Sequence, residues 1–146
     1  MSTGFAMRWP VLQRHAVADA DLDEDGAVRQ DVLEGWVAEA CAEYVGRCAA
    51  LPPAAAVRQL PAPFPAGRLT GRPATVMVTA RATEVRPSSF TLTVRVRASG
   101  GGEDDRVAGT MCVVRLEDPA TGEPIDLGEA VLDELVAMDR SARHIG

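Results

Sequence analysis

A strictly alternating run near the middle of the chain constrains the fold more than any other feature. Over residues 88–98, apolar side chains alternate with threonine and arginine. The apolar set is Phe90, Leu92, Val94 and Val96. A period of two predicts a β-strand with one face buried and the other exposed. Turn sequences at Arg86-Pro87 and at Gly100-Gly101-Gly102 flank this strand and predict an antiparallel meander.

Two further strand-like runs, Thr75–Val85 and Val107–Glu117, complete the predicted meander. The second contains four consecutive apolar residues at 111–114, so we expect that part to be buried on both faces. A turn at Asp118-Pro119-Ala120-Thr121-Gly122 follows it.

Residues 30–48 show helical spacing of apolar side chains. The apolar stripe is Leu33, Trp36, Val37, Ala40, Cys41, Tyr44 and Cys48. The opposite face carries the small residues Gly35, Ala38, Ala42 and Gly46. Because small residues allow another backbone to approach closely, we expect this long helix to be covered on both sides.

The remaining segments complete an α+β prediction. Residues 5–18 predict an irregular first strand with Pro10 at an edge or bulge, and residues 127–138 predict a short C-terminal helix. Residues 51–73 hold six prolines, which indicates a connecting loop with at most a short edge strand near 56–60. Strand, long helix and then a run of strands predict one domain over 1–146, with one helix laid across an antiparallel sheet.

The composition excludes several classes of partner. The net charge of −6 argues against non-specific binding to nucleic acid or to an anionic membrane. Three cysteines without zinc-type spacing predict neither a disulfide framework nor a structural metal, and Cys41 and Cys48 read as buried hydrophobes. No basic leader and no apolar run of about 20 residues is present, so we expect a soluble cytoplasmic protein.

An acidic stretch directly precedes the long helix. Its carboxylates are Asp19, Asp21, Asp23, Glu24 and Asp25. They could be solvated turn and capping residues, which are common where a helix begins. Asp21, Asp23, Asp25 and Gly26 also fit the first half of an EF-hand calcium loop, but Val32 occupies the position where that loop needs a bidentate glutamate.

A third interpretation is catalytic and comes from a family resemblance. The pattern Asp21-x-Asp23-x-x-Gly26-x-Val28, followed by the long helix, resembles the opening of hot-dog-fold thioesterases of the 4-hydroxybenzoyl-CoA thioesterase superfamily. Residues 82–92 resemble the hairpin between the central strands of that family, and residues 114–124 its last strand and turn. The resemblance implies a hot-dog fold, in which a curved antiparallel sheet of about five strands wraps the long helix.

The resemblance also implies a reaction and a site. It places the nucleophile or general base for an acyl thioester on Asp23 and the oxyanion-binding backbone N–H on Gln30. Ala27, Val28 and Arg29 would line the bound substrate. Some superfamily members instead carry their acid on the long helix, which makes Glu39 a second candidate. The implied substrate is an acyl-CoA or an acyl carrier protein thioester, with no cofactor and no metal, and the implied assembly is a homodimer or a dimer of dimers.

This sequence departs from the pattern of the family. Ala27 stands where the family often has histidine, and Arg29 and Gln30 stand where it has asparagines. Arg29 could replace the lost donor. Alternatively, the chain could be a non-catalytic hot-dog module that binds a ligand or partner.

Other polar residues suggest weaker roles. His15 could be an acid–base group, although a lone histidine is more often satisfied near a surface; His144 lies close to the end of the chain. Ser88 and Ser89 lack the surroundings of a serine hydrolase, and we expect them in the hairpin turn. Four strand arginines could contact the nucleotide of CoA or simply keep the sheet soluble. They are Arg81, Arg86, Arg95 and Arg97.

Overall fold

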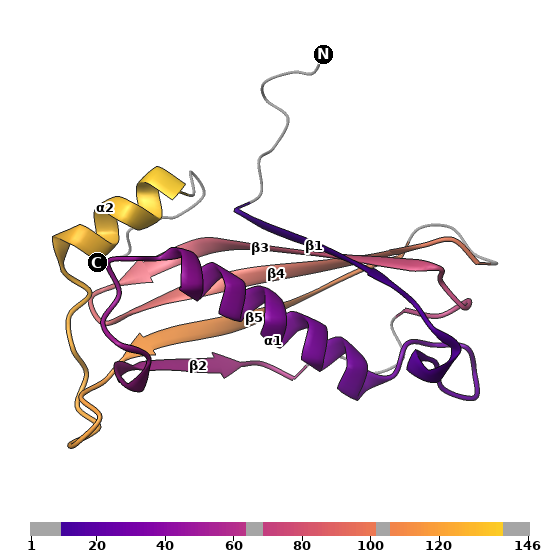
Figure 1. Ribbon diagram of the computed structural model, residues 1–146, viewed down its shortest axis with the longest axis horizontal. Helices are drawn as coiled ribbons and strands as arrows, with labels where there is room; N and C mark the ends of the chain where they lie inside the picture. Colours follow the sequence, from indigo (N-terminus) through magenta and orange to yellow (C-terminus); the bar gives the residue numbers. More distant parts are fainter. Residues whose placement is uncertain (1–9, 64–68, 102–105, 139–146) are drawn as a thin grey trace, which may run out of the picture.

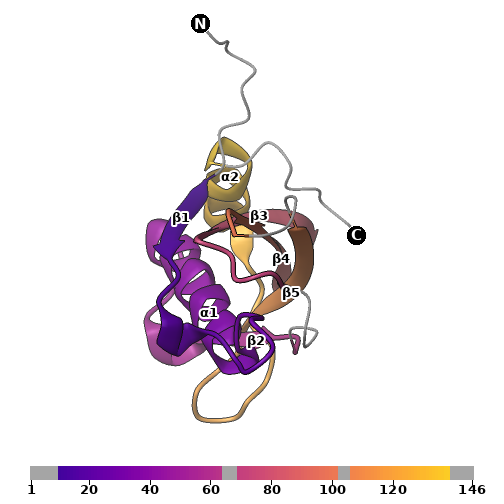
Figure 2. The ribbon, with the colours of Figure 1, turned by 90° about the vertical axis from the view of Figure 1, so that its right-hand side faces the viewer.

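In the computed structural model, which describes residues 10–63, 69–101 and 106–138, a five-stranded antiparallel sheet curls around one long helix (Figures 1 and 2). The strand order is β1-β3-β4-β5-β2. The elements are β1 (Val11–Ala16), α1 (Gln30–Arg47), β2 (Val57–Pro61), β3 (Thr75–Arg86), β4 (Ser89–Ser99), β5 (Arg106–Leu116) and α2 (Gly128–Met138), with short 3-10 turns η1 (Asp19–Asp21) and η2 (Ala54–Ala56). The predicted α+β architecture is confirmed.

The central meander has the predicted register. β3 and β4 pair from Thr75 opposite Ser99 to Arg86 opposite Ser89, with one bulge between Ala82 and Glu84. The apolar set of β4 is fully buried, as the alternation predicts. The Pro87–Ser88 turn and the left-handed Gly100 and Gly101, at φ +84° and +79°, end the strands at the predicted places.

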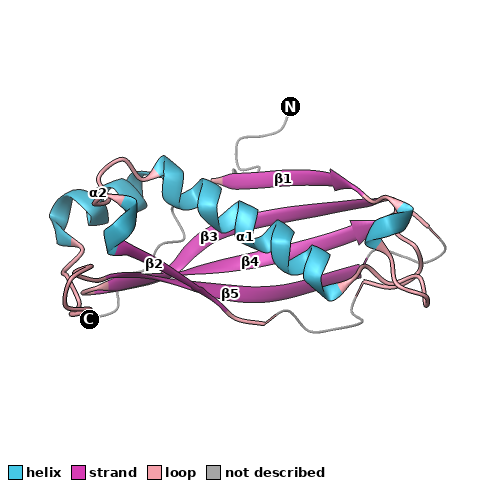
Figure 3. Ribbon diagram, turned by 60° about the horizontal axis from the view of Figure 1, so that its bottom comes forward, coloured by secondary structure: helices cyan, strands magenta, loops and turns pink. Residues whose placement is uncertain are grey.

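α1 lies across the inner face of the sheet (Figure 3). Its buried side chains are Leu33, Val37, Ala40, Cys41 and Tyr44. The Tyr44 ring lies 6.2 Å from the Phe90 ring of β4, centroid to centroid. A side chain such as Leu33 or Val37 contributes about 1.5–3 kcal/mol when it is fully buried, so this single face anchors the helix to the sheet.

The C-terminal end of α1 is joined to α2. The backbone N–H groups of Ala49 and Ala50 donate to the two carboxylate oxygens of Glu134, at 3.0 and 2.8 Å. α2 buries Val131 and Leu135 in the same core. Among the described residues, no helix has the length and apolar character needed to cross a membrane.

Burial within this chain differs from the sequence expectations at two places. Residues 111–114 are not buried on both faces: Cys112 and Val114 point into the core, whereas Met111 is 52% exposed. The small-residue face of α1 is exposed within this chain, and a Cβ added at Gly35 or Gly46 would meet no atom within 4 Å. Alternation therefore extends through β5, and only one side of α1 packs on the chain's own sheet.

The edges of the sheet also follow the sequence. β1 is an edge strand that begins directly after Pro10, and β2 is the short strand expected within the proline-rich segment. The expected first-strand residues 5–9 and part of the proline-rich loop, 64–68, lie outside the described residues, as do Gly102 and His144.

Candidate functional site

The acidic stretch folds into a tight turn that holds Asp23 just before α1. Oδ1 of Asp23 accepts hydrogen bonds from the backbone N–H groups of Asp25 at 2.8 Å and Ala27 at 3.0 Å. The Asp23 N–H in turn donates to the Ala27 carbonyl at 2.8 Å. Oδ2 has no partner within the described residues, and the side chain is exposed. One carboxylate oxygen is thus fixed by the turn, while the other is not held by any described residue.

A neighbouring loop holds this turn in place. The Val28 N–H donates to the carbonyl of Leu69 at 2.9 Å, and the Arg72 N–H donates to the carbonyl of Gly26 at 2.8 Å. Ala27 and Val28 are each 2% exposed. Gly26 has φ +82°, a conformation that glycine adopts without steric cost. Ala27 and Val28, two of the three predicted substrate-lining residues, are therefore largely covered by their own chain.

Arg29 and Gln30 form the start of α1. Arg29 is the N-cap residue and provides no side-chain cap. Its guanidinium donates twice to the Asp31 carboxylate, at 3.1 and 2.5 Å, and once to the Ala20 carbonyl at 3.0 Å. The hydrogen bond from Arg29 lowers the pKa of Asp31. Gln30, the first helical residue, extends its side-chain amide to Glu34 at 3.2 Å.

Glu39 is not brought to the acidic turn. It is an exposed residue of α1, nine positions beyond Gln30, which is about 14 Å further along the helix axis. The structure therefore unites Asp23, Ala27, Val28, Arg29 and Gln30 in one segment and leaves Glu39 apart.

Arg72 is a residue at this turn that the sequence argument missed. Its side chain runs over Gly26, where an added Cβ would lie 2.9 Å from the Arg72 Cγ. Arg72 also has φ +50°, and it is the only non-glycine with positive φ among residues 10–63, 69–101 and 106–138. It lies in the proline-rich segment without periodic spacing, so nothing in the sequence pattern pointed to it.

The turn does not have the surroundings of an EF-hand. β1 and the 3-10 turn η1 precede it, where an EF-hand has a helix. The Oδ2 atom of Asp21 accepts the Ala18 N–H at 2.9 Å. In the part of the chain that the structure describes, no three or more His, Cys, Asp and Glu side chains are placed to hold a metal ion.

His15 corrects another expectation. Its ring stacks on Trp36, with centroids 4.6 Å apart and planes 13° apart. Its Nε2 atom is buried and has no hydrogen-bond partner among the described residues. We had expected a histidine near the surface with its hydrogen bonds satisfied. Trp36 is half-buried, whereas Tyr44 lies fully in the core.

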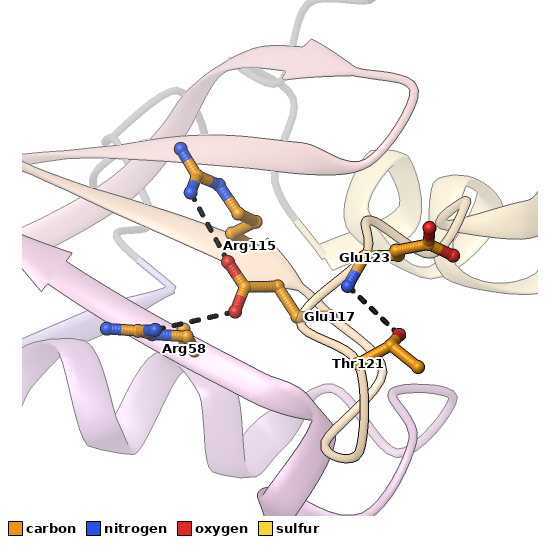
Figure 4. A network of polar contacts seen from close by, with 5 residues as sticks. All are labelled: Arg58, Arg115, Glu117, Thr121 and Glu123. Carbon is orange, nitrogen blue, oxygen red and sulfur yellow. Dashed lines mark hydrogen bonds and ion pairs between the residues drawn. The ribbon is translucent and has the colours of Figure 1, made fainter.

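A second polar cluster lies where β5 ends, at the opposite end of the sheet from the acidic turn (Figures 1 and 4). The Glu117 carboxylate is paired with Arg58 at 3.5 Å and with Arg115 at 3.3 Å. The Glu123 N–H donates to Oγ1 of Thr121 at 3.3 Å in the turn that follows. These contacts join β2 to β5 and tighten the turn. Ser88 and Ser89 lie at the β3–β4 hairpin, as expected.

Comparison with solved structures finds thioesterases of the same fold. A thioesterase from Thermus thermophilus, complexed with coenzyme A and Zn, is 23% identical, with 90% of this chain and 96% of that chain covered and a TM-score of 0.66. A protein of the thioesterase superfamily from Jannaschia sp. CCS1 is 17% identical, with 94% and 87% covered and a TM-score of 0.68. A 4-hydroxybenzoyl-CoA thioesterase variant complexed with 4-hydroxybenzoyl-CoA is 16% identical, with 86% and 97% covered and a TM-score of 0.60.

No protein-family model matches the chain, and no curated protein matches it. The agreement with the solved structures extends over nearly the whole chain. The chain therefore has the hot-dog fold, as the sequence resemblance implied.

Proposed function

We propose that this chain hydrolyses an acyl thioester, with Asp23 as nucleophile or general base. The observation that carries the proposal is the Asp23 carboxylate, which the turn before α1 holds by Oδ1 while Oδ2 has no partner among the described residues. The fold likeness to proteins named as thioesterases, two of them complexed with coenzyme A or a CoA thioester, supports the same reaction class.

In the nucleophilic route, an Asp23 oxygen attacks the thioester carbonyl carbon and the carbon–sulfur bond breaks. The thiolate leaves and takes up a proton, and water then hydrolyses the mixed anhydride to restore Asp23 and release the acid. In the general-base route, Asp23 removes a proton from the water that attacks the carbonyl directly, and the carbon–sulfur bond then breaks as the thiolate leaves and takes up that proton. Both routes place negative charge on the carbonyl oxygen in the transition state.

Gln30 is the proposed source of stabilisation for that charge. It is the first residue of α1, and N–H groups in the first turn of a helix point out along the axis with a partial positive charge. Preorganised donors of this kind lower the barrier by about 3–4 kcal/mol. Arg29 is proposed to contact the substrate beside it, which requires its guanidinium to move from Asp31.

We assign the substrate to the acyl-CoA or acyl carrier protein thioesters, and the active assembly to a homodimer or a dimer of dimers. The exposed small-residue face of α1 supports pairing, because a second copy could approach the helix closely there. The three cysteines are free and buried, which fits the reducing cytoplasm where we place the protein. Glu39 remains the second candidate acid.

The test is hydrolysis of acyl-CoAs of several chain lengths and of an aromatic acyl-CoA, followed by release of free thiol. Release that is proportional to enzyme concentration supports the proposal. Binding of an acyl-CoA without any release of thiol would instead favour the non-catalytic hot-dog module. The family's histidine and asparagines are absent at positions 27, 29 and 30, which supports that alternative.

A further inference from the structure

The sheet concentrates positive charge in a chain that is acidic as a whole. The five described strands contain eight arginines and one acidic residue, Glu84, whose carboxylate is paired with Arg86 at 3.2 Å. The full chain has a net charge of −6, and every described acidic residue except Glu84 lies outside the strands. Such a separation of charge creates a local potential that the net value conceals.

Four of these arginines lie together on the outer face, the side turned away from α1. Residues on one face of a sheet alternate, and register partners are neighbours on that face. Arg14 of β1 pairs with Met77 of β3, which pairs with Arg97 of β4. Arg95 is two residues from Arg97 along β4, and Arg81 lies on β3. We call Arg14, Arg81, Arg95 and Arg97 the arginine face.

Apolar side chains are interspersed with these cations. Leu12, Val107 and Met111, on β1 and β5, are 42%, 53% and 52% exposed. Thr79, which lies between Leu12 and Arg95 in register, is only 5% exposed, because long neighbouring side chains cover it. None of the described elements covers this face, since α1 lies on the other side of the sheet and α2 at its end (Figures 1 and 2).

The dimensions of the face suit a protein rather than a small ligand. From β1 to β5 it crosses three strand spacings, about 14 Å, and Arg95 and Arg97 are about 7 Å apart along their strand. Arginine and methionine are enriched in protein interfaces, and guanidinium groups bind carboxylates with two parallel hydrogen bonds. Docking of the same face of a second copy would bring like charges together, which is costly.

We propose that the arginine face docks an acidic carrier protein that presents the acyl thioester. The identity of this partner rests on the proposed function, whereas the acidic character of the partner rests on the charges of the face. Single-stranded nucleic acid is the less suitable anion, because it is bound by aromatic stacking platforms and no aromatic ring among the described residues lies on this face.

The test measures binding of a fluorescently labelled holo acyl carrier protein to the full chain by anisotropy. We expect binding that weakens steeply with added salt and that weakens at least fivefold in R14Q/R95Q. The matched control is V136E/A137E on the exposed surface of α2, which changes the net charge by the same two units and should bind within twofold of wild type.

Three results would overturn the proposal: no binding of the carrier protein, equal loss of binding in both variants, or tighter binding of a thymidine oligonucleotide or of phosphatidylserine vesicles. Hydrolysis of acyl-CoA by the wild type is measured in parallel. Carrier binding at the arginine face without any hydrolysis would contradict the proposed function and leave the docking surface standing. Hydrolysis of acyl-CoA without carrier binding would support the proposed function and contradict the docking surface.

Discussion

Arg72 is hydrogen-bonded to Gly26 and packs against it: the Arg72 N–H donates to the Gly26 carbonyl at 2.8 Å, and the Arg72 side chain occupies the space beside the Gly26 Cα. This contact joins the loop before β3 to the turn that carries Asp23. The geometry of the candidate site therefore depends on residues about fifty positions apart.

We expect Gly26→Ala to destabilise the protein more than Gly122→Ala. Both glycines have positive φ, at +82° and +76°, so alanine costs about 1–2 kcal/mol at either position. At Gly26 the new Cβ would also lie 2.9 Å from Arg72 Cγ, whereas at Gly122 it would meet nothing within 4 Å. Urea unfolding measures the difference, and equal losses would show that the Arg72 contact does not constrain the turn.

His15→Phe should raise the free energy of unfolding by about 1 kcal/mol. Phenylalanine keeps a ring on Trp36 and removes the buried Nε2 atom that has no described partner, and an unsatisfied buried polar atom costs about 1–3 kcal/mol. Thermal melts measure the change. A lower melting temperature would mean that the imidazole makes a stabilising contact that the described residues do not account for.

Ala38→Arg should convert dimers to monomers if the small-residue face of α1 is the pairing surface. A long charged side chain at this exposed position leaves the helix intact but prevents close approach of another backbone. Light scattering after size exclusion measures the mass. Ala137→Arg on the exposed surface of α2 is the control, and a dimer that survives Ala38→Arg would place the interface elsewhere.

Stability should fall as the pH rises above about 9. Burial, with Glu134 nearby, raises the pKa of the Cys48 thiol to about 12, from an unperturbed value near 9. The folded state then keeps a proton that the unfolded state loses, so stability is fully present below pH 9 and is lost between 9 and 12. The melting temperature of Cys48→Ala should depend less on pH over the accessible part of this range, and an unchanged pH dependence would exclude Cys48 as the cause.

The sequence predicted those helices and strands in which the spacing of apolar side chains marks the buried face. The alternation in β4 and the apolar stripe of α1 gave both elements and their buried faces, because each set of side chains packs on a single surface. The exposure of Met111 was not predicted, because four consecutive apolar residues show no alternation in the sequence. In the structure, Met111 lies on the exposed outer face of β5. Arg72 was missed because its contact with Gly26 depends on how two distant loops meet, and no local pattern encodes such a contact.

Release of thiol from an acyl-CoA by Asp23→Asn and by Asp25→Asn tests the central claim most directly. The asparagine oxygen at 23 can still accept from Asp25 and Ala27, so the turn is kept while the negative charge is lost. Asp25→Asn removes the same charge from the same turn and leaves its backbone N–H in place. We expect kcat to fall by at least about 100-fold in Asp23→Asn and to stay within about threefold of wild type in Asp25→Asn. Full activity of a correctly folded Asp23→Asn would contradict the account and transfer the role to Glu39.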